Sequence, residues 1–141
     1  MAEKTGRCMC GAVSFTARGT LDRFNICACD MCRRVTGSQF FSVWLRMDDV
    51  DMTGAEHIRT LQSSDWAERA FCGKCGSALW YRPTDNSDGV GLSLGLFDDI
   101  AGLEADNHWY TDKEICRTVK LAPAHTMTEA ETHAQFGGGA V

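Results

Sequence analysis

The residues most able to do chemistry are three cysteines within the stretch "NICACDMCRRVTGS". Cys27, Cys29 and Cys32 have C-x-C-x-x-C spacing, so their sulfurs can converge on one metal ion. Three thiolates leave the fourth position of a tetrahedral ion free for water or substrate, and this open position distinguishes catalytic zinc sites from closed structural ones. The spacing therefore predicts an open zinc site that keeps a substrate thiol ionised or polarises a carbonyl group.

Two other interpretations of this cluster stay open. Cys116, much farther along the chain, could supply a fourth sulfur and close the cluster into a second structural site. The three thiols could also form a redox group that binds metal only weakly. An open site is expected to hold zinc less tightly than a closed four-ligand site. Isolated protein could therefore lose the zinc ion of this cluster while a closed site keeps its own.

A second metal site is predicted from four further cysteines. The stretch "FCGKCGSALW" is a C-G-x-C-G zinc knuckle, in which Gly76 can adopt the positive φ that the turn needs and backbone N–H groups face the sulfurs. The stretch "RCMCGAV" places two more cysteines at the expected start of the first strand, where residues i and i+2 face the same side. Together they predict a closed structural zinc site: Cys8, Cys10, Cys72 and Cys75.

The composition describes an ordinary soluble domain. The chain has 141 residues, of which 44% are hydrophobic and 23% charged. Its net charge of −5 argues against a nucleic-acid partner, and no apolar run has the length of a signal peptide or membrane span. A cytoplasmic location is therefore expected, where eight cysteines serve metal binding better than disulfides.

Short β-prone runs between turn residues predict a mostly β fold with little helix. The expected strands lie within residues 11–19, 40–47, 57–64, 67–72, 78–83, 89–97 and 107–110, and the two expected helices within residues 30–37 and 127–136. The acidic run at residues 48–51 is interpreted as a solvated turn. Trp44, Trp80 and Trp109 are interpreted as core residues, and Trp66 as a core residue or, alternatively, a loop aromatic near a site.

The three cysteine motifs, "GRCMCGAVSF", "CACDMCRRVTGSQF" and "FCGKCGSALWYR", resemble the glutathione-dependent formaldehyde-activating enzyme family, which includes centromere-protein-V-like proteins. The similarity extends from about Gly6 to Asp112. It implies a zinc-containing β-tent fold, as in B-type methionine sulfoxide reductases, over residues 1–122, with residues 123–141 as a partly flexible extension. It also implies a structural zinc on the outer two motifs and a catalytic zinc on the middle one.

The resemblance further implies a carbon–sulfur lyase activity that joins glutathione to formaldehyde as S-hydroxymethylglutathione. In that reaction zinc holds the glutathione sulfur as thiolate, and the thiolate attacks the aldehyde carbon. Glutathione carries two carboxylates, so Arg33 and Arg34, beside the cluster, are candidate binding residues. His108 is the histidine expected in the substrate pocket.

The sequence also departs from the family pattern. Ala28 stands where many members have histidine, and Ile115 and Cys116 stand where proline and tryptophan are common, which would reshape one wall of the pocket. The alternative function is a zinc-stabilised binding or scaffold domain without catalysis. The complete three-cysteine cluster favours the enzyme, because a scaffold needs only the closed site.

Overall fold

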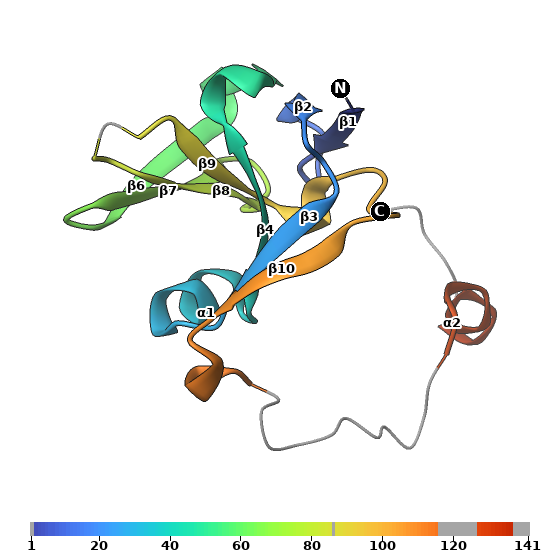
Figure 1. Ribbon diagram of the computed structural model, residues 1–141. Helices are drawn as coiled ribbons and strands as arrows, with labels where there is room; N and C mark the ends of the chain where they lie inside the picture. Colours follow the sequence, from blue (N-terminus) through green and yellow to red (C-terminus); the bar gives the residue numbers. More distant parts are fainter. Residues whose placement is uncertain (1, 86, 116–126, 137–141) are drawn as a thin grey trace.

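The computed structural model describes residues 2–85, 87–115 and 127–136, which form two β-sheets and two short α-helices (Figure 1). The smaller sheet has the strand order β1-β2-β5, with β1 (Ala2–Arg7), β2 (Ser14–Gly19) and β5 (Val50–Thr53). The larger sheet has the order β10-β3-β4-β9-β8-β7-β6. Its strands are β3 (Arg23–Cys27), β4 (Phe40–Arg46), β6 (Ile58–Ser64), β7 (Ala67–Cys72), β8 (Ala78–Pro83), β9 (Gly89–Ser93) and β10 (Glu104–Trp109).

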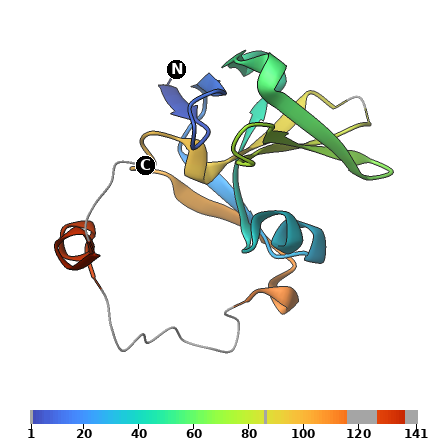
Figure 2. The same ribbon diagram turned by 180° about the vertical axis from the view of Figure 1, so that it is seen from behind.

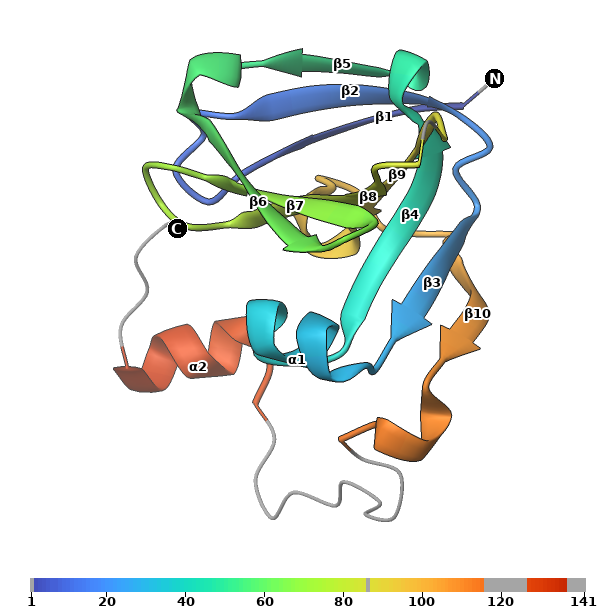
Figure 3. The ribbon, with the colours of Figure 1, turned by 90° about the vertical axis from the view of Figure 1, so that its left-hand side faces the viewer.

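The helices contribute little to the fold. Helix α1 (Asp30–Thr36) follows β3 directly and lies below the large sheet in Figure 3, whereas α2 (Glu129–Phe136) lies apart from both sheets in Figures 1 and 2. Neither helix is long and apolar enough to span a bilayer, and no other helix of the described residues is either. The expectation of a mostly β, β-tent fold with two short helices is confirmed.

The hydrophobic core lies where the two sheets face each other. Alternation along β2 turns Phe15 and Ala17 inward, and Phe15 meets Phe97 edge to face at 5.0 Å between ring centroids. The central strands of the large sheet complete the core with buried aliphatic side chains, chiefly Val43, Leu45, Leu79, Val90 and Leu92. This packing makes a rigid platform from which the opposite face of the large sheet can present functional side chains.

The pairing of β3 with β10 brings Trp109 and the residues after it to the end of β3. It is parallel, unlike every other strand pairing among the described residues, and it sets Trp109 opposite Cys27. The Ala28 N–H also donates to the Trp109 carbonyl at 3.1 Å. Residues separated by some eighty positions in the sequence are thereby brought to the same end of the sheet.

Several local expectations were wrong. Residues 48–51 do not form a solvated turn, because Met47–Asp49 is a 3-10 helix and Asp51 lies in β5, paired with Arg18 at 2.7 Å. Strand β1 was not anticipated, because its polar sequence lacks clear alternation. Of the four tryptophans, Trp80 is buried in the core, but the other three are about half exposed.

Candidate active site

The four-cysteine cluster joins the β1–β2 loop to the β7–β8 turn. Its four sulfurs lie within 4.8 Å of one another, with 3.6 Å between Cys8 and Cys10 and 3.9 Å between Cys10 and Cys72. Sulfurs bound to a tetrahedral zinc at about 2.3 Å are about 3.8 Å apart, so the separations fit that ion. The predicted grouping with Cys75 is confirmed as a site that could hold a metal.

Two members of the four-cysteine cluster, Cys8 and Cys10, lie in a different kind of element from the one predicted. Cys8 and Cys10 do not begin a strand; they lie in the loop after β1, where Gly11 has a φ of 77°. Gly76 in the second loop likewise has a φ of 77°, as predicted. Both left-handed glycines turn the chain back immediately after the second cysteine, so each loop presents two sulfurs inward.

Hydrogen bonds prepare these sulfurs for a metal. The Val13 N–H donates to Cys8 Sγ at 3.3 Å, and the Ser77 hydroxyl lies 3.2 Å from Cys75 Sγ. The Ser77 side chain and then its backbone lower the pKa of Cys75 to about 5. Donors aimed at thiolates stabilise the charged form that binds metal.

The three-cysteine cluster forms where β3 passes into α1. Cys27 is the last residue of β3, Cys29 is the N-cap of α1, and Cys32 lies in the first turn of that helix. Cys27 and Cys29 therefore do not share a strand face, because the strand ends at the first of them. The three sulfurs nevertheless lie within 4.8 Å of one another, and no fourth metal-ligating side chain of the described residues joins them. Cys116 lies outside the described residues.

The N-cap arrangement also orders the cluster. The Cys32 N–H donates to Cys29 Sγ at 3.4 Å, so a cysteine sulfur takes the place of the usual capping oxygen. At the other end of α1, Gly37 adopts a left-handed conformation and its N–H donates to the Arg33 carbonyl at 2.8 Å. The sequence between Cys29 and Gly37 thus holds one short helix and fixes the cysteine spacing in space.

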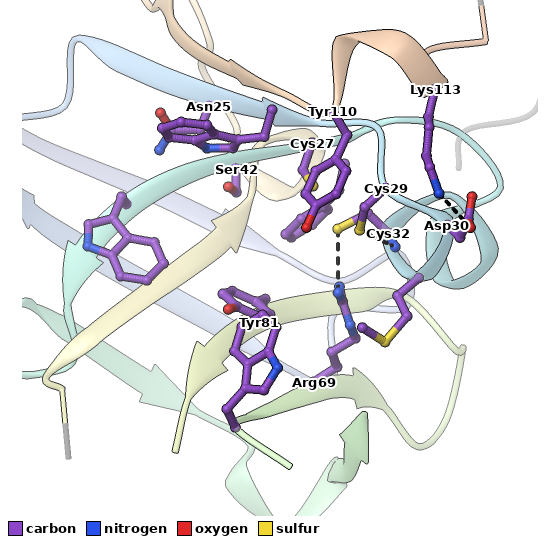
Figure 4. Close-up of a pocket in the computed structure, with 15 residues that line it drawn as sticks. Asn25, Cys27, Cys29, Asp30, Cys32, Ser42, Arg69, Tyr81, Tyr110 and Lys113 are labelled. Atoms are coloured by element: carbon purple, nitrogen blue, oxygen red, sulfur yellow. Dashed lines mark hydrogen bonds and ion pairs between the residues drawn. The ribbon is translucent and has the colours of Figure 1, made fainter. Parts of the chain in front are cut away.

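Arg69 on β7 is the charged residue that the sequence interpretation missed. It is only 7% exposed, its Nη2 donates to Cys32 Sγ at 3.4 Å, and its guanidinium lies 5.1 Å from the centre of the Tyr81 ring (Figure 4). Its Nε has no hydrogen-bond partner within the described structure. A charged residue between the small, buried Ala67 and Ala70 is the sequence signal that could have revealed it.

This environment gives two of the three thiols, Cys27 and Cys32, different pKa values. A hydrogen bond from the Cys27 thiol lowers the pKa of Cys32 to about 5; burial opposes this effect and Arg69 adds to it. The same interaction with Cys32, together with burial, raises the pKa of Cys27 well above its usual range. In zinc-free protein Cys32 is therefore the first of these two thiols to ionise.

We expect this order to appear in alkylation of zinc-free protein by iodoacetamide at pH 6.5. Because the lowered pKa of Cys32 leaves it ionised above about pH 5, Cys32 should be modified before Cys27. In Arg69→Met the thiolate loses its cationic partner, so the pKa should rise; a rise of about two units would lower the ionised fraction, and with it the rate at pH 6.5, about fourfold. Peptide mass spectrometry against time measures both rates.

The matched control is Arg82→Met, on the neighbouring strand β8. Arg82 pairs with Glu68 at 2.6 Å and does not line the cavity, so this variant removes an arginine without removing the contact to Cys32. It should react like the wild type. Equal slowing in both variants would mean that Arg69 does not act through its charge on Cys32.

A cavity of about 660 Å³ opens beside the three-cysteine cluster, with Cys27, Cys29 and Cys32 in its wall (Figure 4). Its charged lining residues are Arg69, Asp30 and Lys113, the last two joined by a 2.9 Å ion pair. Hydrogen bonding to Lys113, and then its charge, lowers the pKa of Asp30. The cavity has the size of a small-molecule site and contains the predicted open cluster.

Tyr110 has an unusual conformation at this cavity. Its φ of 58° is positive, which no other non-glycine residue in the described part of the chain shows. It follows β10 directly, and Figure 4 shows its ring extending toward the cysteine sulfurs with the hydroxyl at the inner end. A bulky residue held in this region costs about 1–3 kcal/mol, and such strain is concentrated at functional sites.

The predicted substrate-binding residues do not line this cavity. Arg33 and Arg34 are exposed on α1, and Arg33 pairs with Asp30 at 3.4 Å. His108 Nε2 lies 3.1 Å from the Glu114 carboxylate, away from the cavity lining. The structure instead places Arg69 and Lys113 there, because the strand pairing and the turn after β10, rather than sequence proximity, decide which side chains face the cluster.

The fold is similar to that of a solved structure. A crystal structure of a Rhodobacter sphaeroides protein from a structural-genomics programme matches with a TM-score of 0.60 and 23% sequence identity. The match covers 74% of this chain and 98% of the other. At this identity the likeness establishes the shared fold.

Two curated relatives carry names that describe a reaction class. An uncharacterized lyase of Schizosaccharomyces pombe is 27% identical over 106 residues, which cover 75% of this chain and 77% of the relative. A Halomonas elongata protein provisionally named glutathione-dependent formaldehyde-activating enzyme is 36% identical over 83 residues, which cover 53% of each chain. The second alignment therefore spans about half of either protein.

The family comparison covers most of the chain. The sequence profile described as glutathione-dependent formaldehyde-activating enzyme matches residues 3–113, and this range includes both cysteine clusters, Arg69 and Tyr110. The resemblance inferred from the three cysteine motifs is confirmed. The chain belongs to the glutathione-dependent formaldehyde-activating enzyme family.

Proposed function

We propose that this protein is a zinc-dependent enzyme of the carbon–sulfur lyase type that adds the thiolate of glutathione to formaldehyde or a related small electrophile. The observation that carries the proposal is the open three-cysteine cluster in the wall of a ligand-sized cavity. A fourth ligand could reach that cluster from the cavity, as a catalytic site requires. Membership of the family and the names of the relatives support the reaction class.

The residues of the cluster fit a thiol-binding zinc site. Thiolate ligands favour zinc among the common divalent ions, and a zinc ion bound here would supply Lewis acidity and a position for a substrate sulfur. Arg69 places a fixed positive charge beside Cys32, which offsets part of the negative charge of the three thiolates. This charge favours keeping a fourth sulfur in its ionised, nucleophilic form.

Tyr110 is placed to handle the proton of the addition. As the carbon–sulfur bond forms, the electron pair of the carbonyl double bond moves to oxygen, which then needs a proton. The Tyr110 hydroxyl extends toward the sulfurs and can donate that proton, and the open cavity lets water restore it. In the reverse reaction the Tyr110 phenolate takes the proton back from the hydroxyl of the adduct while the carbon–sulfur bond breaks.

Tyr110→Phe is therefore expected to lower the catalysed rate about 100-fold, because it removes a positioned proton donor. The zinc content should stay at the wild-type value, since Tyr110 is not among the grouped metal ligands. The rate is measured by NMR exchange between ¹³C-formaldehyde and S-hydroxymethylglutathione. An unchanged rate would exclude the proposed role of the hydroxyl.

The function itself is tested by two-dimensional NMR exchange between ¹³C-formaldehyde and S-hydroxymethylglutathione. Exchange must be measured because formaldehyde and glutathione also combine without an enzyme. Zinc-loaded, reduced protein at micromolar concentration should raise the exchange rate above the uncatalysed value in proportion to its concentration. No acceleration by protein that retains both zinc ions would favour the zinc-stabilised binding domain instead.

A further inference from the structure

The cavity beside the three-cysteine cluster is lined largely by aromatic rings. Six of its lining residues are aromatic and come from widely separated parts of the chain: Phe40, Trp44, Trp66, Tyr81, Trp109 and Tyr110. Four of them remain between 47% and 56% exposed, although burial of such side chains is favourable. Large apolar side chains gathered around a concave site, and left uncovered, mark a surface that a ligand covers.

Part of this wall is built into the sheet. The Trp44 ring lies across Gly89 on β9, where a Cβ atom would overlap the ring, so the glycine allows the indole to lie flat on the strand. Tyr81 continues the surface, with its ring centroid 6.4 Å from that of Trp44 and 6.2 Å from that of Trp66. The three rings form one continuous apolar wall, which we call the aromatic wall.

The charged groups of the cavity are few by comparison. Glutathione has two carboxylates and an ammonium group, each of which requires a polar partner. Of the cationic lining residues, Arg69 is buried against Cys32 and Lys113 is paired with Asp30. Lys113 and Asp30 can bind polar ends of a thiol beside the cluster, and the aromatic wall remains for an apolar group. Formaldehyde contributes a single carbon and would leave that wall uncovered.

We infer that the electrophile handled at this site carries an aromatic or long aliphatic group, which packs on the aromatic wall while the sulfur of the adduct lies at the three-cysteine cluster. The substrate class is thus the thiol adduct of an aryl or long-chain aldehyde. This inference rests on the proposed function, because it assigns the sulfur to that cluster. It narrows the electrophile of that function to aldehydes that carry such a group, which formaldehyde lacks.

Stable thioethers of glutathione test the inference without turnover. Zinc-loaded full-length protein is titrated with S-methylglutathione and with S-benzylglutathione, and binding is followed by tryptophan fluorescence, since three tryptophans line the cavity. The benzyl compound should bind at least about tenfold more tightly and change the fluorescence more, because its ring stacks on the wall.

Two variants locate the effect. Trp66→Ala removes one ring of the aromatic wall and should reduce the preference for the benzyl compound at least about threefold. Leu61→Ala is the matched control: Leu61 is 58% exposed on the adjoining strand β6 and does not line the cavity, so the preference should be unchanged. An equal loss in both variants would overturn the assignment of the benzyl group to the wall.

The remaining outcomes separate this inference from the proposed function. Catalysed exchange with formaldehyde together with equal affinity for the two thioethers would overturn the inference and leave the proposed function standing. A clear preference for the benzyl compound without catalysed exchange would support the inference and contradict the proposal that formaldehyde is the substrate. Failure of both thioethers to bind would overturn the inference.

Discussion

Cys32→Ser should lower the zinc content of reduced, anaerobically purified protein from two ions per chain to one and should abolish catalysed exchange. Cys32 is the buried member of the open cluster and receives the hydrogen bond of Arg69, so a serine there removes both a ligand and the partner of a buried charge. Loss of an outer partner of a metal ligand already costs about 10–100-fold in affinity or activity, and loss of the ligand itself should cost more. Zinc per chain by elemental analysis and the NMR exchange rate give the two values.

Val35→Ser on the same helix is the matched control for this experiment. Val35 is 45% exposed and lies outside both the cluster and the cavity lining, so its variant should keep two zinc ions and the wild-type rate. Two zinc ions in Cys32→Ser would show that the three cysteines are not the second site. Full activity with one zinc ion would separate catalysis from the cluster altogether.

Cys72→Ser should have the largest effect on stability. Cys72 is fully buried at the end of β7, and with the other three sulfurs it ties the β1–β2 loop to the β7–β8 turn. Structural zinc sites contribute about 10–16 kcal/mol in small zinc domains, which is comparable with the 5–15 kcal/mol total stability of ordinary domains. We expect the variant to be unfolded at 37 °C, or to melt at least about 10 °C below the wild type, by circular dichroism.

Cys32→Ser provides the comparison, because it also replaces a buried cysteine by serine but affects the open cluster. Its melting temperature should fall by less than that of Cys72→Ser, because the four-cysteine site stays intact, and a strong chelator should unfold it as it unfolds the wild type. If the two variants melted together, the two clusters would not have the distinct structural and catalytic roles assigned to them. Similar melting of Cys72→Ser and the wild type would remove the structural role of the four-cysteine site.

The two cysteine clusters were predictable because metal ligation is largely a matter of local spacing. Cys72 and Cys75 flank one tight turn, and Cys27, Cys29 and Cys32 lie within six consecutive residues, so chain geometry alone brings each group together. Strand positions were predictable for a similar reason, because alternation of apolar residues is visible within one strand. The joining of Cys8 and Cys10 to the knuckle was an inference from counting ligands, and the structure brings these sulfurs together.

The cavity was not predictable, because its lining depends on contacts between distant segments. The parallel pairing of β10 with β3 places Trp109 beside Cys27 and turns Tyr110 toward the cluster, and neither the partner strand nor its direction can be read from a short window of sequence. Trp44 was assigned to the core because an apolar strand position looks the same whichever sheet face it occupies. Arg33 and Arg34 were chosen for their nearness in the chain, whereas α1 carries both on its exposed side.

The sequence by itself therefore determined the family, the mostly β fold and the two sets of cysteines that could hold a metal, since these depend on residue types at short separations. Only the tertiary structure decided which side chains surround the open cluster. Arg69 supplies the charge at Cys32, and the aromatic wall supplies the surface for substrate. The physical reason is that the direction in which a side chain points from a sheet, and what it then meets, are determined by strand pairing and packing across the whole domain.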